Sequence, residues 1–329
     1  MSSGYAYPKG VPVNPKDPIP DSEAPISIFG YIPNRTFAIV ALITFCVAVL
    51  VHSFYLVRFR GTRTFQALIA FGALCEVVGY AARLTASKNP FIVVKFVIQY
   101  FFIVVAPVFF QAAFYIALAG ALKRLDRGGR ALLGFNPKIL VAVMITADVI
   151  TTIVQIAGAA LIGVAESTTY RDGQSSTITS AQANDILLAG LSLQTASFLA
   201  FLSLLAVCIV RSRKAQLSSR LPRRFTTVLF VASLLVFLRT TFRLAETAEG
   251  VFSYASRTEP LFAGLEYLPV ILAVLLFAAF PLYKLLPPKQ HTSHVSADEE
   301  QHRLAMQAET SNASEPTLVR PGSQMVERK

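Results

Sequence analysis

The chain alternates between long apolar runs and short stretches in which charged residues gather. An α-helix needs about 20 mostly apolar residues to cross the hydrocarbon core of a bilayer. Runs of this length recur seven times, which predicts an all-α polytopic membrane protein with seven transmembrane helices in one bundle. The predicted spans are residues 36–57, 64–84, 91–122, 139–164, 186–210, 225–247 and 262–283.

The sixth and third spans each contain a feature that affects whether they cross as straight helices. The uncharged part of the sixth span, Phe225 to Leu238, is about 21 Å long at 1.5 Å per residue. It crosses the bilayer only if Arg239 and Arg243 are accommodated inside the bundle. Pro107 in the third span lacks a backbone N–H, so we expect a kink there, with a hinge as the alternative.

Composition supports the membrane interpretation. Of the 329 residues, 54 % are apolar and 15 % are charged, and the mean hydropathy is +0.55. A soluble globular domain carries about 25 % charged residues, so this chain matches a soluble fold poorly. Its apolar content also argues against a disordered protein. The three cysteines each lie inside an apolar run, which argues against disulfide and zinc frameworks.

Lysine and arginine gather in three of the connections between spans. The connections after the first, third and fifth spans hold three, five and six of them. Basic connections face the cytosol, which places the amino terminus outside and the carboxyl terminus in the cytosol. We therefore divide the chain into an extracytosolic polar segment (1–34), a transmembrane domain (35–284) and a disordered cytosolic tail (285–329).

The same distribution accounts for the net charge of +11. Basic residues at the cytosolic ends of the helices are placed to meet anionic lipid head groups. A nucleic-acid-binding protein needs a folded basic face with aromatic platforms. We find no such face, so membrane lipids and other amphipathic small molecules are the expected partners.

Ionisable side chains inside spans are the candidate functional groups, because a charge at the bilayer centre costs at least about 2.5–3.5 kcal/mol. The spacing i, i+4, i+7 puts Glu76, Tyr80 and Arg83 on one face of the second span. The fourth and sixth spans repeat this spacing. The predicted substrate-binding residues are Glu76, Tyr80, Arg83, Gln99, Asp148, Gln155, Gln194, Arg239, Arg243, Glu246 and Glu266.

The rise per residue places these polar groups between the middle of the membrane and its outer side. The cytosolic half of the bundle is then nearly apolar, apart from Gln111. The three arginines and four carboxylates approach neutrality only if they cluster. One interpretation is a structural ion-pair network. The other is a polar cavity for an amphipathic ligand, with its amine on Glu76 or Asp148 and its phosphate or hydroxyls on the arginines and glutamines.

The pattern does not indicate an enzyme. His52 is the only histidine within a span, so neither a membrane metallohydrolase nor a Ser–His–acid arrangement can be assembled. We predict no catalytic residues, no metal and no cofactor. We also find no Gly-rich nucleotide-binding loop, so transport would be facilitated or coupled to an ion, with Glu76 or Asp148 as proton carrier.

Five blocks of sequence follow one another in a recognisable order. They are YIPNRTFAI (31–39), CEVVGYAARL (75–84), KNPFIVVKFVIQYFFIVVAPVFFQAAFYIALAGAL (88–122), TADVITTIVQIAGAALIG (146–163) and LRTTFRLAETAEG (238–250). This series resembles the fungal lipid-translocating exporter family, the RTA-like proteins, over residues 31–284. The resemblance implies a seven-span fungal protein whose relatives are tied to resistance to toxic amphiphiles, release of sphingoid bases, and porphyrin or haem handling.

We therefore predict a transporter or translocase that exports or flips an amphipathic lipid-like molecule of the sphingoid base, aminosterol or phospholipid type. Such an activity would confer stress resistance, and the resemblance implies the plasma membrane. One alternative is a seven-helix receptor that signals through the basic segments 123–138 and 211–224. Another is a porphyrin or haem exporter, with Tyr80 or His52 as a conceivable ligand.

Overall fold

The computed structural model of the protein describes residues 10–20, 23–124, 136–172, 179–214, 221–250 and 253–286, with the backbone alone at residues 137 and 163–172. The chain divides into two compact units, Met1–Pro288 and Lys289–Lys329. Every described residue belongs to the first unit. The predicted disorder of the cytosolic tail falls outside the described residues and stays a prediction, as does the orientation of the termini.

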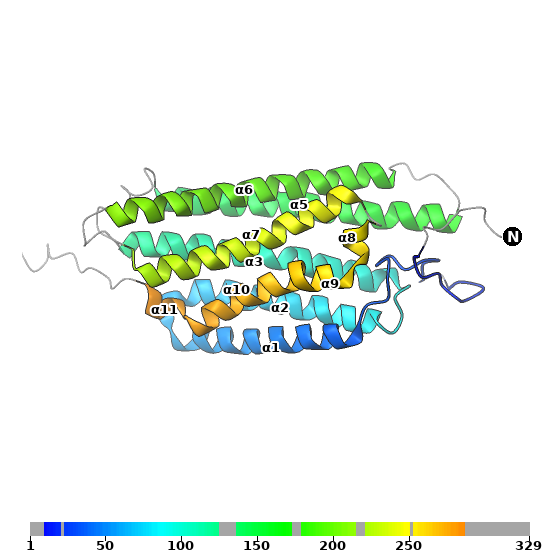
Figure 1. Ribbon diagram of the computed structural model, residues 1–329, viewed down its shortest axis with the longest axis horizontal. Helices are drawn as coiled ribbons and strands as arrows, with labels where there is room; N and C mark the ends of the chain where they lie inside the picture. The colour runs from blue at the N-terminus through cyan, green and yellow to red at the C-terminus, as the bar shows by residue number, and fades with distance from the viewer. Residues whose placement is uncertain are drawn as a thin grey trace, which may run out of the picture. The chain divides into compact units, whose positions relative to one another are not determined.

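Seven segments in the described ranges are long and apolar enough to cross a membrane, as predicted. They are α1 (Arg35–Arg58), α2 (Arg63–Ala86), α3 (Val93–Arg124), α5 (Pro137–Asp172), α6 (Ser180–Lys214), α7 (Arg223–Glu249) and a last segment that contains α10 (Leu268–Ala279). Figure 1 shows the helices aligned along one axis. The protein is an all-α, multi-pass membrane protein, and its described residues contain isolated β-bridges but no strand.

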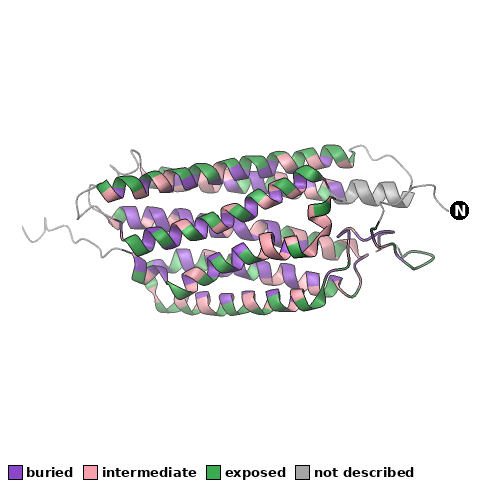
Figure 2. Cartoon of the chain, viewed as in Figure 1, coloured by how far each residue is buried: buried purple, intermediate pink, exposed green. Residues whose placement is uncertain are grey.

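Consecutive helices pack against each other, as short connections favour. The helix α2 lies between α1 and α3, α5 packs on α3 and α6, and α7 packs on α6 and α10. Because α10 also contacts α1, the last transmembrane segment packs beside the first. Buried residues face the interior and exposed apolar residues face outward (Figure 2), which suits contact with lipid.

Glycine allows two of these helix pairs to approach closely. A Cβ atom added at Gly158 of α5 would lie 2.7 Å from the backbone nitrogen of Leu187 on α6. One added at Gly79 of α2 would lie 2.7 Å from the Ile103 side chain on α3. Small residues at helix interfaces are typical of membrane proteins, because packing rather than burial from water holds the helices together.

Two helices extend beyond their predicted spans. The pattern predicts spans at 139–164 and 186–210, whereas α5 reaches Asp172 and α6 begins at Ser180. The added residues at these two ends are mostly polar, so hydropathy does not mark them. They contain neither proline nor glycine, so nothing in them ends a helix that the membrane-embedded part has already formed.

The seventh span, predicted at 262–283, is present, but it is not a regular α-helix throughout. The segment consists of α9 (Glu259–Leu261), a π-helical turn η3 (Phe262–Tyr267) and α10, followed by the short α11 (Leu282–Leu285). Pro269 has no N–H to donate to the carbonyl four residues earlier, which favours the wider turn before it. Pro281 ends α10 for the same reason and disfavours a helical conformation in the residue before it.

The polar segment ahead of α1 packs over one end of the bundle. Val11, Ile26 and Phe29 are buried there. The backbone N–H of Ala24 donates to the carbonyl of Phe91, in the connection between α2 and α3, at 2.8 Å. The sequence predicts only a polar segment at 1–34, because its few apolar residues follow no helical or strand period.

Glu23 is the polar anchor of this segment. Its carboxylate accepts from Lys16 Nζ at 2.6 Å, from Asn14 Nδ2 at 3.0 Å and from Asn89 Nδ2 at 2.8 Å. Asn89 belongs to the connection between α2 and α3, so this carboxylate joins the segment to the bundle. The hydrogen bonds, led by that from Lys16, lower the pKa of Glu23 from its ordinary 4.5 to about 2.

Candidate substrate-binding site

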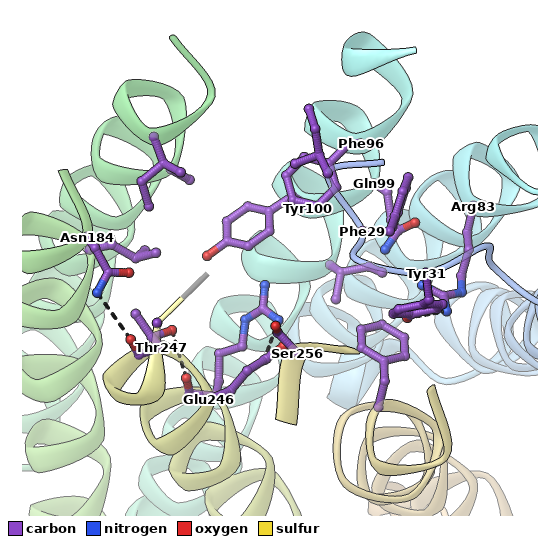
Figure 3. Close-up of a pocket in the computed structure, with 18 residues that line it drawn as sticks. Phe29, Tyr31, Arg83, Phe96, Gln99, Tyr100, Asn184, Glu246, Thr247 and Ser256 are labelled. Atoms are coloured by element: carbon purple, nitrogen blue, oxygen red, sulfur yellow. Dashed lines mark hydrogen bonds and ion pairs between the residues drawn. The ribbon is translucent and has the colours of Figure 1, made fainter. Parts of the chain in front are cut away.

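A cavity of about 110 Å³ lies at the end of the bundle where residues 10–33 pack. Its wall is built from that segment, from α2, α3, α5, α6 and α7, and from residues between α7 and the first residue of η3, Phe262. Aromatic rings and polar side chains both line it (Figure 3), so the wall is amphipathic. Four of the predicted site residues line the cavity: Arg83, Gln99, Arg243 and Glu246.

On one side of the cavity, α7 presents an arginine and a glutamate that pair with each other. Arg243 donates from Nη1 to Oε2 of Glu246 at 2.8 Å. The guanidinium carbon of Arg243 lies 4.6 Å from the centre of the Tyr100 ring on α3, close enough for a cation–π attraction. Asn184 of α6 donates to the carbonyl of Thr247 at 3.2 Å and joins α6 to this wall (Figure 3).

On the other side, Arg83 is buried against a glutamate that sequence reasoning missed. Its Nη2 donates to Oε1 of Glu259 at 2.5 Å and to the hydroxyl of Tyr31 at 2.7 Å. The guanidinium carbon lies 4.5 Å from the centre of the Phe262 ring. Glu259 also accepts from the backbone N–H of Asn34 at 2.9 Å, so one carboxylate joins α1, α2 and α9.

Glu259 and Tyr31 escaped prediction because they lie in connections rather than in spans. For Glu259 a signal exists: a buried Arg83 needs an anion, and Glu259 is the only acidic residue between α7 and the predicted seventh span. Burial raises the pKa of Tyr31 above its ordinary value of 10, although Arg83 opposes this. The hydroxyl is therefore neutral at physiological pH and can donate a hydrogen bond into the cavity that it lines.

Behind the cavity, Arg239 joins three helices. Its Nη2 donates to Oε1 of Glu266 at 2.5 Å and to the backbone carbonyl of Ile103 at 3.0 Å. Ile103 lies four residues before Pro107, and proline has no N–H, so this carbonyl has lost its helical donor. Arg239 supplies the missing donor, and α3 continues as one helix through Pro107. Glu266 lies in the π-helical turn η3. Arg239 therefore binds both this turn and the carbonyl that Pro107 leaves without a donor in α3.

Glu76 is a buried carboxylate without a partner. Its residue is 2 % exposed, and within the described ranges it makes no hydrogen bond or ion pair. Arg239 and Glu266 are the charged groups that act on it. Two ionised carboxylates and one guanidinium leave this group one positive charge short of neutrality. Oε2 of Glu266 is buried without a donor, and so is Oε1 of Gln99, a residue of the cavity wall.

Tyr80 lies beside these charges in an aromatic environment. Its ring stacks on Phe45 at a centroid distance of 5.7 Å and meets Tyr267 edge-on at 5.8 Å. Glu76 and Glu266 are its electrostatic neighbours. We call Glu76, Tyr80, Arg239 and Glu266 the deep cluster. It offers acceptor oxygens in excess of donors, which is the environment that an ammonium group or a proton would satisfy.

The expectation of one cluster of arginines and carboxylates is wrong for Asp148. Asp148 accepts from the hydroxyl of Tyr115 at 2.7 Å, and no arginine of the described ranges pairs with it. Gln155 donates to Gln194 at 2.7 Å, and Gln194 donates to Gln111 at 3.4 Å. Helical spacing identifies the shared face of a helix but not its neighbour, and α5 packs on α3 and α6 rather than on α7.

The opposite half of the bundle is also less apolar than predicted. Nδ1 of His52 and Oε1 of Gln66 are 2.7 Å apart, and Nε2 of His52 is 3.2 Å from the carbonyl of Val274. Gln66 escaped prediction because it is uncharged and lies in the first turn of α2. In the described ranges, no three His, Cys, Asp or Glu side chains are grouped as metal ligands would be.

Comparison with known proteins places the chain in a family. A family model described as "RTA1 like protein" matches residues 69–289, which cover most of the transmembrane domain. The sphingoid long-chain base transporter RSB1 of Saccharomyces cerevisiae is 27 % identical over 289 residues, covering 76 % of this chain and 72 % of the relative. No solved structure matches the chain.

Two further relatives come from the same yeast. Protoporphyrin uptake protein 1 is 26 % identical over 223 residues, covering 66 % of this chain and 69 % of the relative. Protein RTM1 is 24 % identical over 220 residues, covering 65 % and 67 %. The resemblance inferred from the sequence blocks is thereby confirmed, and the chain belongs to the RTA1-like protein family.

Proposed function

We propose that the protein is a transporter that moves an amphipathic, lipid-like molecule with a cationic amine, of the sphingoid base type, across the membrane. A relative named as a sphingoid long-chain base transporter supports this proposal. The unpaired carboxylate of Glu76 is the observation that carries it. A buried carboxylate without a counter-ion is costly, and an ammonium ligand would offset that cost.

The cavity has the size of a head group rather than of a whole lipid. One water molecule needs roughly 10–15 Å³ of such space, so about 110 Å³ admits a polar group of several heavy atoms. The amine and hydroxyls of a sphingoid base match that size, and its hydrocarbon chain would lie between helices or in the bilayer. Tyr31, Gln99 and Asn184 offer hydrogen bonds to hydroxyls, and Phe29 and Phe96 offer apolar contact.

Glu76 suits the amine better than Asp148. Neither carboxylate is part of the cavity wall, but Asp148 already accepts a hydrogen bond from Tyr115 and Glu76 accepts none in the described ranges. The deep cluster lies directly behind that wall, since Ile103 lines the cavity and Arg239 binds its carbonyl. The missing positive charge would be a proton when the site is empty and the ammonium when it is loaded. Transport would then exchange an amine for a proton, without nucleotide hydrolysis.

The distribution of basic residues supports a direction. The cavity lies at the end of the bundle opposite to the basic connections that follow α1, α3 and α6. Under the positive-inside rule that end faces outward. The transporter would therefore release its substrate on the outer side, and export from the cytosol across the plasma membrane would protect the cell from toxic amphiphiles.

The proposal is tested by flux into liposomes that contain only this protein. Fluorescent analogues of a sphingoid base, an aminosterol, a phosphatidylcholine and a protoporphyrin are compared with protein-free liposomes. We expect rapid movement of the amine-bearing probes. No flux of any probe, combined with ligand-dependent binding of partner proteins, would favour the receptor alternative, whose basic segments 123–138 and 211–224 lie partly outside the described residues.

Preferential flux of the porphyrin would favour the second alternative, which a relative named as a protoporphyrin uptake protein supports. Two features weigh against it. The cavity of about 110 Å³ is small for a planar macrocycle. His52 already engages Gln66 and the carbonyl of Val274 with its two ring nitrogens, so it is not available as a haem ligand.

A further inference from the structure

A second cavity, of about 160 Å³, lies at the opposite end of the bundle. It is bounded by the connection between α1 and α2, by the last turns of α3, and by α11. Figure 1 shows these helix ends together at the end of the bundle where α11 is labelled. None of its lining residues belongs to the candidate site described above.

The polar part of this second cavity is cationic. Arg60, Arg63 and Arg124 line it, and none of its lining residues is acidic. A guanidinium nitrogen of Arg124 lies within 3.7 Å of the point where a Cβ atom on Gly61 would stand. The α3 arginine therefore reaches across to the α1–α2 connection. Arginine forks match phosphate oxygens in pairs, and three of them around one space favour a multiply charged anion.

The amino terminus of α2 opens into the same cavity. Thr62, the residue before this 24-residue helix, does not cap it with its side chain. Its hydroxyl oxygen is buried without a hydrogen-bond partner, and the residue is 5 % exposed. Thr62, Thr64 and Phe65 all line the cavity. The start of α2, which Thr62 does not cap, and an unpaired buried hydroxyl thus line the space that an anion would occupy.

The inner part of the cavity is apolar. Phe65, Ile116, Leu282 and Leu286 contribute to its wall. Gly120 of α3 also lines it, and a Cβ atom there would have no neighbour within 4 Å. A free phosphate ion would leave this apolar space unfilled. A lipid would place its phosphate among the arginines and the root of its acyl chains against the apolar wall.

We propose that this cavity binds the phosphate head group of an anionic phospholipid. Its end of the bundle carries the basic connections, which we place in the cytosol, where anionic lipids are enriched. The bound lipid would hold the α1–α2 connection, the end of α3 and α11 together. This proposal does not depend on the substrate of the first cavity.

The proposal is tested with the full-length protein in neutral detergent and dioctanoyl phosphatidic acid as the probe, with binding measured by native mass spectrometry. The variants are Arg60→Gln with Arg63→Gln, which removes two charges, and Gly120→Leu, which fills the apolar space and leaves every charge. Arg223→Gln with Arg224→Gln is the matched control, because these exposed arginines lie at the same end but outside the cavity.

We expect both cavity variants to weaken binding of phosphatidic acid about tenfold or more, and the control pair to bind like wild type. Dioctanoyl phosphatidylcholine should bind much more weakly than phosphatidic acid. Equal losses in the cavity variant pair and the control pair would indicate nonspecific charge attraction and overturn the proposal. Displacement of the lipid by millimolar inorganic phosphate would assign the site to free phosphate and also overturn it. If Gly120→Leu does not fold, the comparison of the Arg60→Gln, Arg63→Gln variant with the control pair is sufficient to test the proposal.

Discussion

Arg239 is the hydrogen-bond donor to two buried acceptors, the carboxylate of Glu266 and the backbone carbonyl of Ile103. Without its guanidinium, Glu266 would be an unpaired buried carboxylate, and the carbonyl of Ile103 would have neither a helical nor a side-chain donor. Breaking a buried ion pair by removing one partner costs about 3–5 kcal/mol. We therefore expect Arg239→Met to lower the stability of the purified protein by about that amount.

A second substitution isolates the role of the carbonyl. Pro107→Ala restores a backbone N–H that can donate to Ile103. In wild type that carbonyl is already satisfied, whereas in Arg239→Met it is not. We expect Pro107→Ala to stabilise the Arg239→Met background by about 1–3 kcal/mol more than it stabilises wild type, in denaturation experiments arranged as a double-mutant cycle. Equal effects in both backgrounds would show that Arg239 does not replace the missing donor.

The sequence identified which residues are buried more reliably than it identified their partners. Glu76, Asp148 and Arg239 were predicted to face the interior, and they are at most 2 % exposed. Helical spacing cannot tell which other helix meets that face, so the separation of Asp148 from the arginines was not foreseen. Glu259 was not foreseen because hydropathy excludes it from every span. Whether these residues bind substrate stays a prediction.

The order of the segment ahead of α1 depends in part on the charge of Glu23. The pKa of Glu23 is about 2 in the folded protein and 4.5 ordinarily, so its ionised form stabilises the packed segment. This contribution is complete above pH 4.5 and is lost as the pH falls from about 4.5 towards 2. We expect the hydrogen-exchange protection of the Ala24 amide, bonded to Phe91, to fall over this range.

The variant Glu23→Gln supplies the control for this pH dependence. Its Ala24 amide should be less protected than in wild type at pH 6, with little further change down to pH 3. Amides within α2 should keep their protection in both proteins. A wild-type profile that matches that of Glu23→Gln would mean that other contacts, such as the burial of Ile26 and Phe29, hold the segment.

Among the elements, the apolar helices were predictable and their irregular ends were not. A hydropathy pattern marks the part of a helix that meets lipid, so it found α1 and α2 within two residues at each end. It could not mark the polar extensions of α5 and α6. The π-helical turn before α10 is followed by Pro269 and holds Glu266, whose pairing with Arg239 is visible only in three dimensions.

The two ends of the bundle differ in chemistry: one holds the amphipathic cavity and the other the cavity lined by arginines. The orientation of the protein in the membrane decides which end faces the cytosol. Thr179 lies at the cavity end, just before α6, and Lys138 lies at the other end, near the start of α5, and both are exposed. In a Cys46→Ala background, we expect Thr179→Cys to react with an impermeant maleimide in intact cells. Lys138→Cys should react only after permeabilisation. The reverse pattern would contradict export towards the cavity end.

The account of the whole molecule rests on an acidic group, behind an amphipathic cavity, that lacks one positive charge. Flux in proteoliposomes tests this most directly when a free-amine sphingoid base is compared with its N-acetylated form in wild type, Glu76→Gln and Glu249→Gln. Glu249 is exposed at the end of α7 and provides the matched control. Gln has nearly the same size as a protonated Glu and is likewise uncharged, so the fold should persist.

We predict that wild type and Glu249→Gln move the free amine, that Glu76→Gln moves it about tenfold more slowly or not at all, and that none of them moves the acetylated form at a comparable rate. Wild-type flux through Glu76→Gln, or equal flux of the acetylated lipid, would contradict the central claim.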